Sequence, residues 1–140
     1  MADDESSWLA LRAALWPDTA ETDHRAEMQR WLAEPHRYGQ FIAFDADSPV
    51  GFAEVALRFE YVNGTDSSPV GFLEGIYVVP AARRHGIARE LVAACEAWAR
   101  ARGCSEFASD ADIGNAASHL MHRALGFDET ERVVCFCKRL

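Results

Sequence analysis

The fold of this 140-residue chain is decided by the stretch Val78-Val79-Pro80-Ala81-Ala82-Arg83-Arg84-His85-Gly86-Ile87-Ala88. It joins an apolar strand to a helix through a turn that contains proline and glycine. The helix is predicted over residues 87–101, because apolar side chains recur there at three- and four-residue spacing. These are Ile87, Leu91, Ala94, Cys95 and Trp98. The free N–H groups and dipole at its start, beside two arginines, favour bound pyrophosphate.

Other phosphate-binding loops are excluded by their absence from the sequence. No Gly-x-x-x-x-Gly-Lys-Ser/Thr motif is present, and no Gly-x-Gly-x-x-Gly follows a first strand. A turn with a purely structural role remains the alternative, because a short arginine and glycine turn before a helix also arises by chance.

Size and composition predict one globular domain over residues 1–140. Apolar residues make up 49% of the chain and charged residues 26%. No apolar run reaches the ~20 residues of a membrane span, and no secretory leader opens the chain, so we expect a cytoplasmic protein. The net charge of −8 disfavours a nucleic-acid surface. The four cysteines lack zinc or redox spacing, and we interpret them as reduced core or strand residues: Cys95, Cys104, Cys135 and Cys137.

The predicted elements alternate in a mixed α/β order. Two helices come first, and three strands then lead to the turn and helix described above. A strand, a short helix and a final strand complete the order. Outside residues 87–101, the expected helices are residues 4–15, 23–33 and 115–124, and the expected strands are residues 40–45, 50–62, 71–79, 105–110 and 130–139. Turns are expected at Asp47-Ser48-Pro49 and Asn63-Gly64, and a helix end at Gly103.

The spacing Arg83-x-x-Gly86-x-Ala88 resembles the acetyl-coenzyme A loop of the GNAT acyltransferase superfamily, whose pattern is Gln/Arg-x-x-Gly-x-Gly/Ala. The resemblance implies the GNAT fold: a mostly antiparallel central sheet, flanked by helices, in which two neighbouring strands splay to admit the pantetheine arm. Members usually begin with a strand, whereas residues 1–7 are polar and lead directly into a helix. The usual first strand is therefore expected to be absent, with the start lying upstream, the sheet edge open, or a partner chain covering it.

Within the superfamily, several stretches resemble the aminoglycoside 6′-N-acetyltransferases. They match in chain order: Leu15-Trp16-Pro17, Tyr61-Val62-Asn63-Gly64, Asp66-Ser67-Ser68-Pro69-Val70, Phe72-Leu73-Glu74-Gly75-Ile76, Ala108-Ser109-Asp110, Leu125-Gly126-Phe127 and Glu129-Thr130-Glu131-Arg132-Val133. This likeness implies acetyl transfer from acetyl-coenzyme A to the 6′-amine of an aminoglycoside, without a metal, and antibiotic resistance as the phenotype.

Acetyl transfer to an amine that is mostly protonated needs a group that takes a proton. Glu74 and Asp110 are the candidates, since their strands flank the splay of this fold, and both carboxylates would also bind substrate ammonium groups. A solvent-facing role is the alternative for each. The resemblance adds substrate contacts from Trp16, Tyr61 and Glu131, although Trp16 fits a core position and Glu131 a surface charge equally well.

A general acid is also expected, and at its position this chain departs from the family pattern. Many family members carry a tyrosine five residues before the phenylalanine of Leu-Gly-Phe, and here that position is His122. His122 can donate a proton to the departing thiolate, and solvent is the alternative donor.

On the donor side, the resemblance implies that backbone groups of Ile76, Tyr77 and Val78 pair with the pantetheine amides. It places the pyrophosphate against the turn and the first helical residues: Arg83, Arg84, His85, Gly86, Ile87, Ala88 and Arg89. Asn115 is expected to contact coenzyme A, or to be only a helix N-cap.

Two alternatives to this function remain open: a GNAT enzyme that acts on a polyamine or a protein N-terminus, and a coenzyme A-binding protein without catalysis. We expect a homodimer, because the subgroup commonly dimerises and the predicted last strand offers a surface for pairing.

Overall fold

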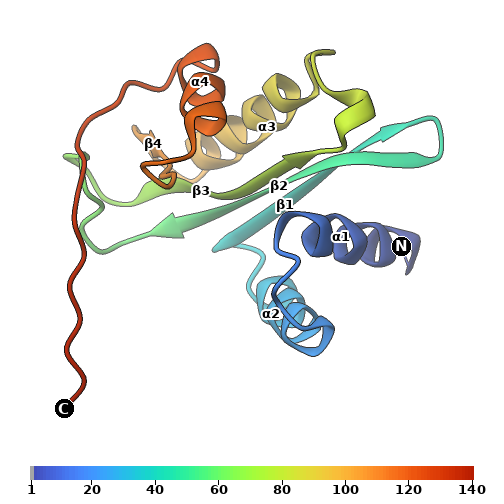
Figure 1. Cartoon of the computed structure of the whole chain (residues 1–140), viewed down its shortest axis with the longest axis horizontal. Helices are drawn as coiled ribbons and strands as arrows, with labels where there is room; N and C mark the ends of the chain where they lie inside the picture. The colour runs from blue at the N-terminus through green and yellow to red at the C-terminus, as the bar shows by residue number, and fades with distance from the viewer. Residues whose placement is uncertain (1) are drawn as a thin grey trace.

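A four-stranded sheet with helices on both faces organises the chain (Figure 1). In this computed structural model, which describes residues 2–140 and side chains from residue 4 onward, one 3-10 turn, η1, accompanies the helices and strands. The elements in chain order are α1 (Ala2–Leu15), α2 (Glu21–Ala33), β1 (Tyr38–Asp45), β2 (Ser48–Arg58), β3 (Val70–Val78), η1 (Pro80–Ala82), α3 (Ile87–Ala101), β4 (Phe107–Ala108) and α4 (Ala116–Ala124).

The sheet changes character along β3. Strands β1, β2 and β3 form an antiparallel meander, and α3 then crosses over to β4, which pairs with β3 in parallel. That parallel pairing covers only Gly71 with Phe107 and Phe72 with Ala108. From Leu73 to Val78, no strand of the described chain pairs with this edge of β3. The splay expected from the family resemblance is therefore present, and it leaves backbone N–H and C=O groups of β3 available to a ligand.

Each face of the sheet has its own apolar core. Successive side chains of a strand point to opposite faces, and residues of β2 accordingly divide between two clusters. Phe52 packs with residues of α1 and α2, including Trp8 and Trp31. Ala53 and Val55 pack instead with residues of α3, including Cys95. The two helical layers thus fix β2 and β3 from both sides.

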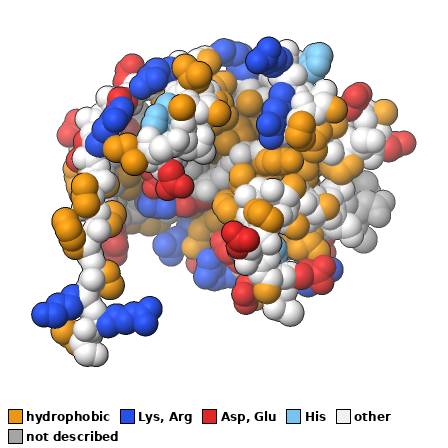
Figure 2. All heavy atoms as spheres, viewed as in Figure 1, with side chains coloured by type: hydrophobic (Ala, Val, Ile, Leu, Met, Phe, Trp, Pro, Cys, Tyr) orange, Lys and Arg blue, Asp and Glu red, His pale blue; other side chains and the backbone are white. Residues whose placement is uncertain are grey.

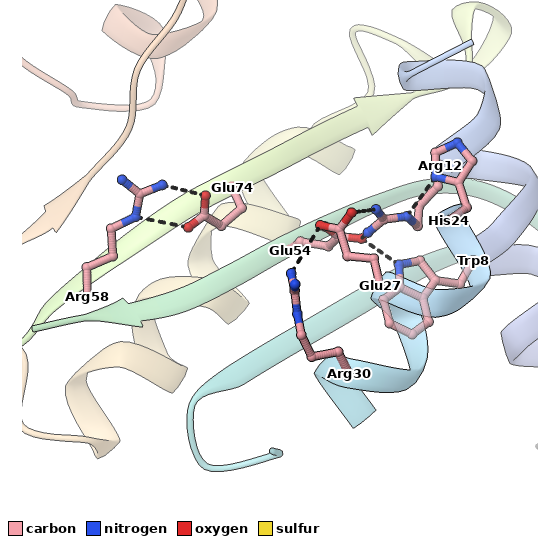
Figure 3. A network of polar contacts seen from close by, with 8 residues as sticks. All are labelled: Trp8, Arg12, His24, Glu27, Arg30, Glu54, Arg58 and Glu74. Carbon is pink, nitrogen blue, oxygen red and sulfur yellow. Dashed lines mark hydrogen bonds and ion pairs between the residues drawn. The ribbon is translucent and has the colours of Figure 1, made fainter. Parts of the chain in front are cut away.

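A polar cluster lies within the α1 and α2 layer (Figure 3). Glu54 is 1% exposed and accepts hydrogen bonds from the indole N–H of Trp8, at 2.8 Å, and from the guanidinium of Arg12. Arg12, itself 2% exposed, also donates to His24 and pairs with Glu27 at 3.0 Å. Burial raises the pKa of Glu54, whereas Arg12 and Trp8 act to lower it. Arg12 is therefore the main compensation for a carboxylate placed deep inside the protein.

Most predicted elements are confirmed, with shifted ends. Helix α3 has the predicted bounds, and Gly103 follows it with φ +85°. Strand β2 ends at Arg58 rather than at Val62, and residues 59–69 form a loop. Glu106 holds this loop, because its side chain accepts a hydrogen bond from the Asp66 N–H at 2.9 Å. Strand β4 spans two residues of the six predicted, since only these pair with β3.

The predicted final strand, residues 130–139, is wrong. Residues 127–140 contain no helix or strand, and Val134 and Phe136 are 78% and 92% exposed. Figure 2 shows this tail standing away from the body, with apolar side chains along it. The alternating apolar pattern is real, but a strand also requires a neighbour that accepts its hydrogen bonds, and the tail has none in the described chain.

The cysteine prediction is half correct. Cys95 and Cys104 are buried core residues, and burial raises the pKa of Cys95 to about 12, which keeps its thiol protonated. Cys135 and Cys137 are exposed in the tail, contrary to the core or strand position predicted for them. The position predicted for them depended on the final strand, which does not form.

Candidate active site

A cleft of about 1050 Å³ opens where β3 and β4 part. Its lining combines segments that are far apart in the sequence. They are the end of α1 with Trp16, the β3 residues 73–78, the turn into α3 (residues 82–84 and 86–89), residues 109–112 after β4, and most of residues 115–125, which form α4 and its ends. The volume lies at the upper end of the range for small-molecule pockets, which suits a large ligand or two ligands together.

The charges of the cleft divide into two groups. Arg83, Arg84 and Arg89 come from the turn after β3 and the first turns of α3. The carboxylates come from the middle of β3 and from the segment after β4: Glu74, Asp110 and Asp112. One part of the cleft therefore suits phosphate groups, and the other suits ammonium groups.

Glu74 occupies a β-bulge of β3. The register with β2 pairs Gly75 with Glu54 and Leu73 with Val55, so Glu74 is the extra residue between them. A bulge re-aims the side chain of the inserted residue, and Glu74 lines the cleft at 23% side-chain exposure. The local distortion of the strand thus places a carboxylate at the site.

Arg58 holds this carboxylate in a two-point contact (Figure 3). Its Nη2 donates to Glu74 Oε1 at 2.7 Å, and its Nε donates to Oε2 at 3.1 Å. The guanidinium also lies 3.6 Å from the centroid of the Phe72 ring. Such paired contacts fix the plane of a carboxylate as well as its position. Sequence analysis missed Arg58, because its partner is 16 residues away and only the strand register brings them together.

Asp110 differs from Glu74 in having no fixed counter-ion. It is exposed, it lines the cleft, and no described side chain forms an ion pair or hydrogen bond with it. Its oxygens are available to water or to a cation. The structure thus places both predicted carboxylates at one cleft, one anchored and one free.

Both ring nitrogens of His122 are engaged inside the cleft lining. Nδ1 lies 2.7 Å from the Ser118 carbonyl oxygen, and Nε2 lies 2.8 Å from Ser109 Oγ. A carbonyl only accepts hydrogen bonds, so Nδ1 carries the hydrogen of that contact. The ring also packs edge-on against Phe127, with centroids 5.1 Å apart. His122 is therefore held in one orientation by contacts on three sides.

Trp16 serves both the core and the cleft. It lines the cleft and packs against the core cluster of α1 and α2. A Cβ at Gly75 would lie 2.6 Å from Trp16 Cη2, so the indole needs the bare backbone of β3 at that position. His24 contacts the Trp16 carbonyl oxygen through Nε2 at 3.3 Å, while its Nδ1 accepts from Arg12. The buried polar cluster thereby reaches the wall of the cleft.

The turn into α3 has the backbone expected of an anion site. Arg84 and Gly86 have φ values of +67° and +81°, and Gly86 is the N-cap of α3 without a side-chain cap. The N–H groups of the first helical turn are thus left for a ligand. Arg83 donates from Nε to the Val78 carbonyl at 2.8 Å, and Arg89 donates to the Ala124 carbonyl at 2.8 Å. Together with the open edge of β3, these residues fit a pantetheine arm that ends in phosphates.

Asn115 acts as the N-cap of α4. Its side-chain oxygen accepts a hydrogen bond from the Ser118 N–H at 3.0 Å, and the residue also lines the cleft. The capping alternative is therefore confirmed, and a ligand contact is compatible with it.

Three predicted site residues do not line the cleft. His85 is exposed on the turn before α3. Tyr61 is 75% exposed on the loop after β2, and Glu131 is exposed in the tail.

The described residues provide neither a cluster of metal ligands nor a membrane-spanning helix. No group of three or more histidine, cysteine, aspartate or glutamate side chains is arranged to hold a metal ion. No described helix combines the length and apolar character needed to cross a membrane.

Comparison with known proteins gives consistent matches over the chain. A sequence profile of the Acetyltransferase (GNAT) family matches residues 8–127. The chain is 56% identical over 139 residues to "Aminoglycoside N(6')-acetyltransferase type 1" of Serratia marcescens, an alignment that covers 99% of this chain and 94% of the relative. The relative of the same description from Acinetobacter haemolyticus is 52% identical, with 95% and 90% covered.

Solved structures agree with this likeness. The crystal structure of aminoglycoside antibiotic 6'-N-acetyltransferase AAC(6')-IG from Acinetobacter haemolyticus superimposes with a TM-score of 0.92 at 50% identity, and covers 96% of this chain and 92% of its own. The structure of AAC(6')-Iy in complex with the bisubstrate analog CoA-S-monomethyl-acetylneamine has a TM-score of 0.93 at 44% identity, with 96% and 91% covered.

Proposed function

This chain belongs to the acetyltransferase (GNAT) family, and we propose that it transfers the acetyl group of acetyl-coenzyme A to the 6′-amine of aminoglycosides. It is an acetyl-coenzyme A-dependent N-acetyltransferase. The observation that carries the aminoglycoside assignment is the divided charge of the cleft, with arginines beside an open strand edge and carboxylates beyond it. Acetylation removes a positive charge from the drug, so resistance is the expected phenotype.

The donor side works mainly through the backbone. Backbone groups of β3 at Ile76, Tyr77 and Val78, which β4 does not pair with, contact the pantetheine amides as a neighbouring strand would. The N-terminus of α3 and the adjoining side chains neutralise the pyrophosphate. We assign this contact to Arg83, Arg84, His85, Gly86, Ile87, Ala88 and Arg89, with Asn115 as a further contact.

The acceptor side works through side chains. Glu74 and Asp110 attract the ammonium groups of an aminosugar, and one of them takes a proton from the reacting amine through water. Trp16 offers an indole face to a sugar ring. The neutral amine then attacks the thioester carbonyl directly, and the departing coenzyme A takes up a proton. Tyr61 and Glu131 contribute to aminoglycoside binding from the exposed loop and the tail.

Paired aminoglycosides test the reaction and its position together. Coenzyme A thiol release is measured with two drugs that differ only in a 6′-amine or a 6′-hydroxyl. We expect release with the amine alone, because only a neutral nitrogen is nucleophilic enough at this site. Release with neither drug, while calorimetry detects acetyl-coenzyme A binding, would contradict the assignment. Faster turnover of spermidine than of any aminoglycoside would show that the substrate is another amine.

We also propose one domain over residues 1–140, a homodimer and a cytoplasmic location, where acetyl-coenzyme A is available. The dimer is supported by the tail, whose apolar residues Val133, Val134 and Phe136 are 54%, 78% and 92% exposed. A second copy of the chain would cover them and supply the strand partner that the tail lacks. Thr130 anchors the start of this tail against Gly64, where a Cβ would leave no room.

Light scattering checks the assembly of the full chain. We expect the mass of two chains, and a shift to one chain when Val134 and Phe136 are both replaced by aspartate, because charge opposes burial of these positions. Lys138→Gln is the matched control, since it changes a tail residue without touching the apolar ones. A single-chain mass of the wild-type protein at every concentration tested would remove the dimer proposal.

A further inference from the structure

Ser109 is the first residue beyond the point where β3 and β4 separate. The last pair of the two strands is Phe72 with Ala108, and Ser109 follows directly and lines the cleft. Glu74, which we assign to the acceptor side, lies two residues beyond Phe72 on the neighbouring strand. The phosphate-binding turn is at the far end of β3, after Val78. A donor that extends from that turn along β3 brings its thioester toward Ser109.

We propose that the Ser109 hydroxyl protonates the departing coenzyme A thiolate, and that His122 acts only through this hydroxyl. The inference rests on the proposed function and deepens it. Its basis is the 2.8 Å contact between Ser109 Oγ and His122 Nε2, together with the 2.7 Å contact that fixes Nδ1 on the Ser118 carbonyl. Because both ring nitrogens are occupied, the imidazole presents no free N–H to the reacting sulfur. Ser109 is the group that joins it to the cleft.

The protonation state of the imidazole decides where the Ser109 hydrogen points. When the ring is neutral, Nδ1 carries its hydrogen, and Nε2 accepts a hydrogen bond from the Ser109 hydroxyl. When both nitrogens carry hydrogen, Nε2 donates to Ser109 Oγ, and the hydroxyl hydrogen is free to turn toward the cleft. The same two contact distances fit both states, so the switch needs no movement of the ring.

The amine nitrogen forms a bond to the thioester carbonyl carbon, and the carbon–sulfur bond breaks with its electron pair on sulfur. The sulfur takes the hydroxyl proton of Ser109, and Ser109 takes the Nε2 proton of the charged imidazole, which becomes neutral. The substrate ammonium releases two protons in forming the amide. One of them restores the imidazole through water, and the other leaves to solvent.

Ser118 is the nearest competing hydroxyl, and its position argues against the same role. Its Oγ lies 3.3 Å from His122 Nδ1, the nitrogen already committed to the Ser118 carbonyl. The hydroxyl therefore sits on the anchored side of the ring and away from Nε2. Ser118→Ala removes it and keeps the backbone carbonyl that orients the ring, which makes this variant the matched control.

The experiment compares steady-state kinetics of Ser109→Ala, Ser109→Thr and Ser118→Ala on a 6′-amino aminoglycoside. Loss of an acid catalyst lowers turnover by about 100-fold or more in general. A thiolate is a good leaving group and depends less on protonation, so a smaller loss is expected here. We therefore expect kcat of Ser109→Ala to fall by about 10-fold or more, with both KM values unchanged. Ser109→Thr, which keeps a hydroxyl, is expected to retain most of kcat, and Ser118→Ala is expected to lose less of kcat than Ser109→Ala does, because it removes only the hydroxyl on the anchored side of the ring.

A double-mutant cycle separates a relay from two independent effects. His122→Phe alone should lower kcat about as much as Ser109→Ala, and the double variant should be no slower than either. Wild-type kcat in Ser109→Ala, or fully multiplicative losses in the double variant, would overturn the proposal. Because wild-type turnover is measured in the same series, failure of the relay is distinct from failure of the proposed acetyl transfer.

Discussion

Glu74→Gln is expected to lower kcat/KM for the aminoglycoside by about 100-fold, the range associated with a lost proton acceptor or charged contact. Glutamine keeps the shape of the side chain and can retain one hydrogen bond from Arg58. It cannot hold an ammonium group by charge, nor accept the proton of the reacting amine. The affinity for acetyl-coenzyme A should be unchanged, because the donor contacts come from the far end of β3 and from α3. Steady-state kinetics with each substrate varied in turn measures both quantities.

Glu60→Gln is the matched control for Glu74→Gln. It removes a carboxylate from the exposed loop after β2, outside the cleft lining, and should leave kcat/KM near the wild-type value. Equal losses in the two variants would mean that the effect of Glu74 is only the general charge of the protein. If Glu74→Gln has wild-type kinetics, Glu74 neither takes the proton nor binds the ammonium group, and Asp110 becomes the next candidate for both roles.

Arg12→Met is expected to reduce the free energy of unfolding by about 3–5 kcal/mol, the usual result of removing one partner of a buried ion pair. Methionine fills much of the space, but among the described residues it leaves the Glu54 carboxylate, which is 1% exposed, with the Trp8 indole as its remaining donor. His24 and Glu27 lose their contacts with the same guanidinium. Urea unfolding followed by tryptophan fluorescence measures the change.

The loss in Arg12→Met should depend on pH. Burial already raises the pKa of Glu54 in the folded protein, and removal of Arg12 takes away the main charge that lowers it. A carboxyl whose folded pKa is raised stabilises the folded state below its unfolded pKa, and this contribution is lost as pH rises through the folded pKa. The variant should therefore be least destabilised at acidic pH and most at neutral pH. Arg25→Met, which removes an exposed arginine paired with Glu21 at 3.6 Å, should change stability by less than about 0.5 kcal/mol. An equal loss in both variants at every pH would contradict the buried-pair explanation.

Sequence patterns were sufficient to predict a helix or strand where residues in the same segment also mark its ends. The helix 87–101 was predicted residue for residue, since its apolar stripe has glycine just before and just after it. The cleft residues near this helix could also be predicted from the sequence, because the loop pattern resembles that of a known family. Glu74 and Asp110 were identified because their strands flank the splay in that family.

Features that depend on pairing between distant residues could not be predicted. The alternating pattern of residues 130–139 looks like a strand, but a strand forms only against a neighbour, and the described chain offers none. The contact of Arg58 with Glu74 follows from the register of β2 and β3, which a bulge shifts. The engagement of Ser109 with His122 likewise needs the end of β4 to lie beside α4. Sequence shows the residue types in each case, and only the fold shows the pairing.

The open edge of β3 means that the two substrates contact different kinds of group, and these groups differ in how easily mutation changes them. The donor meets mostly main-chain groups, which persist through substitution of the side chains that carry them. The acceptor, in the proposed assignment, meets the side chains of Trp16, Glu74 and Asp110, each of which a single codon change can replace. Substitutions along one wall of the cleft can therefore alter the range of aminoglycosides accepted, while the other wall continues to bind the same acetyl donor.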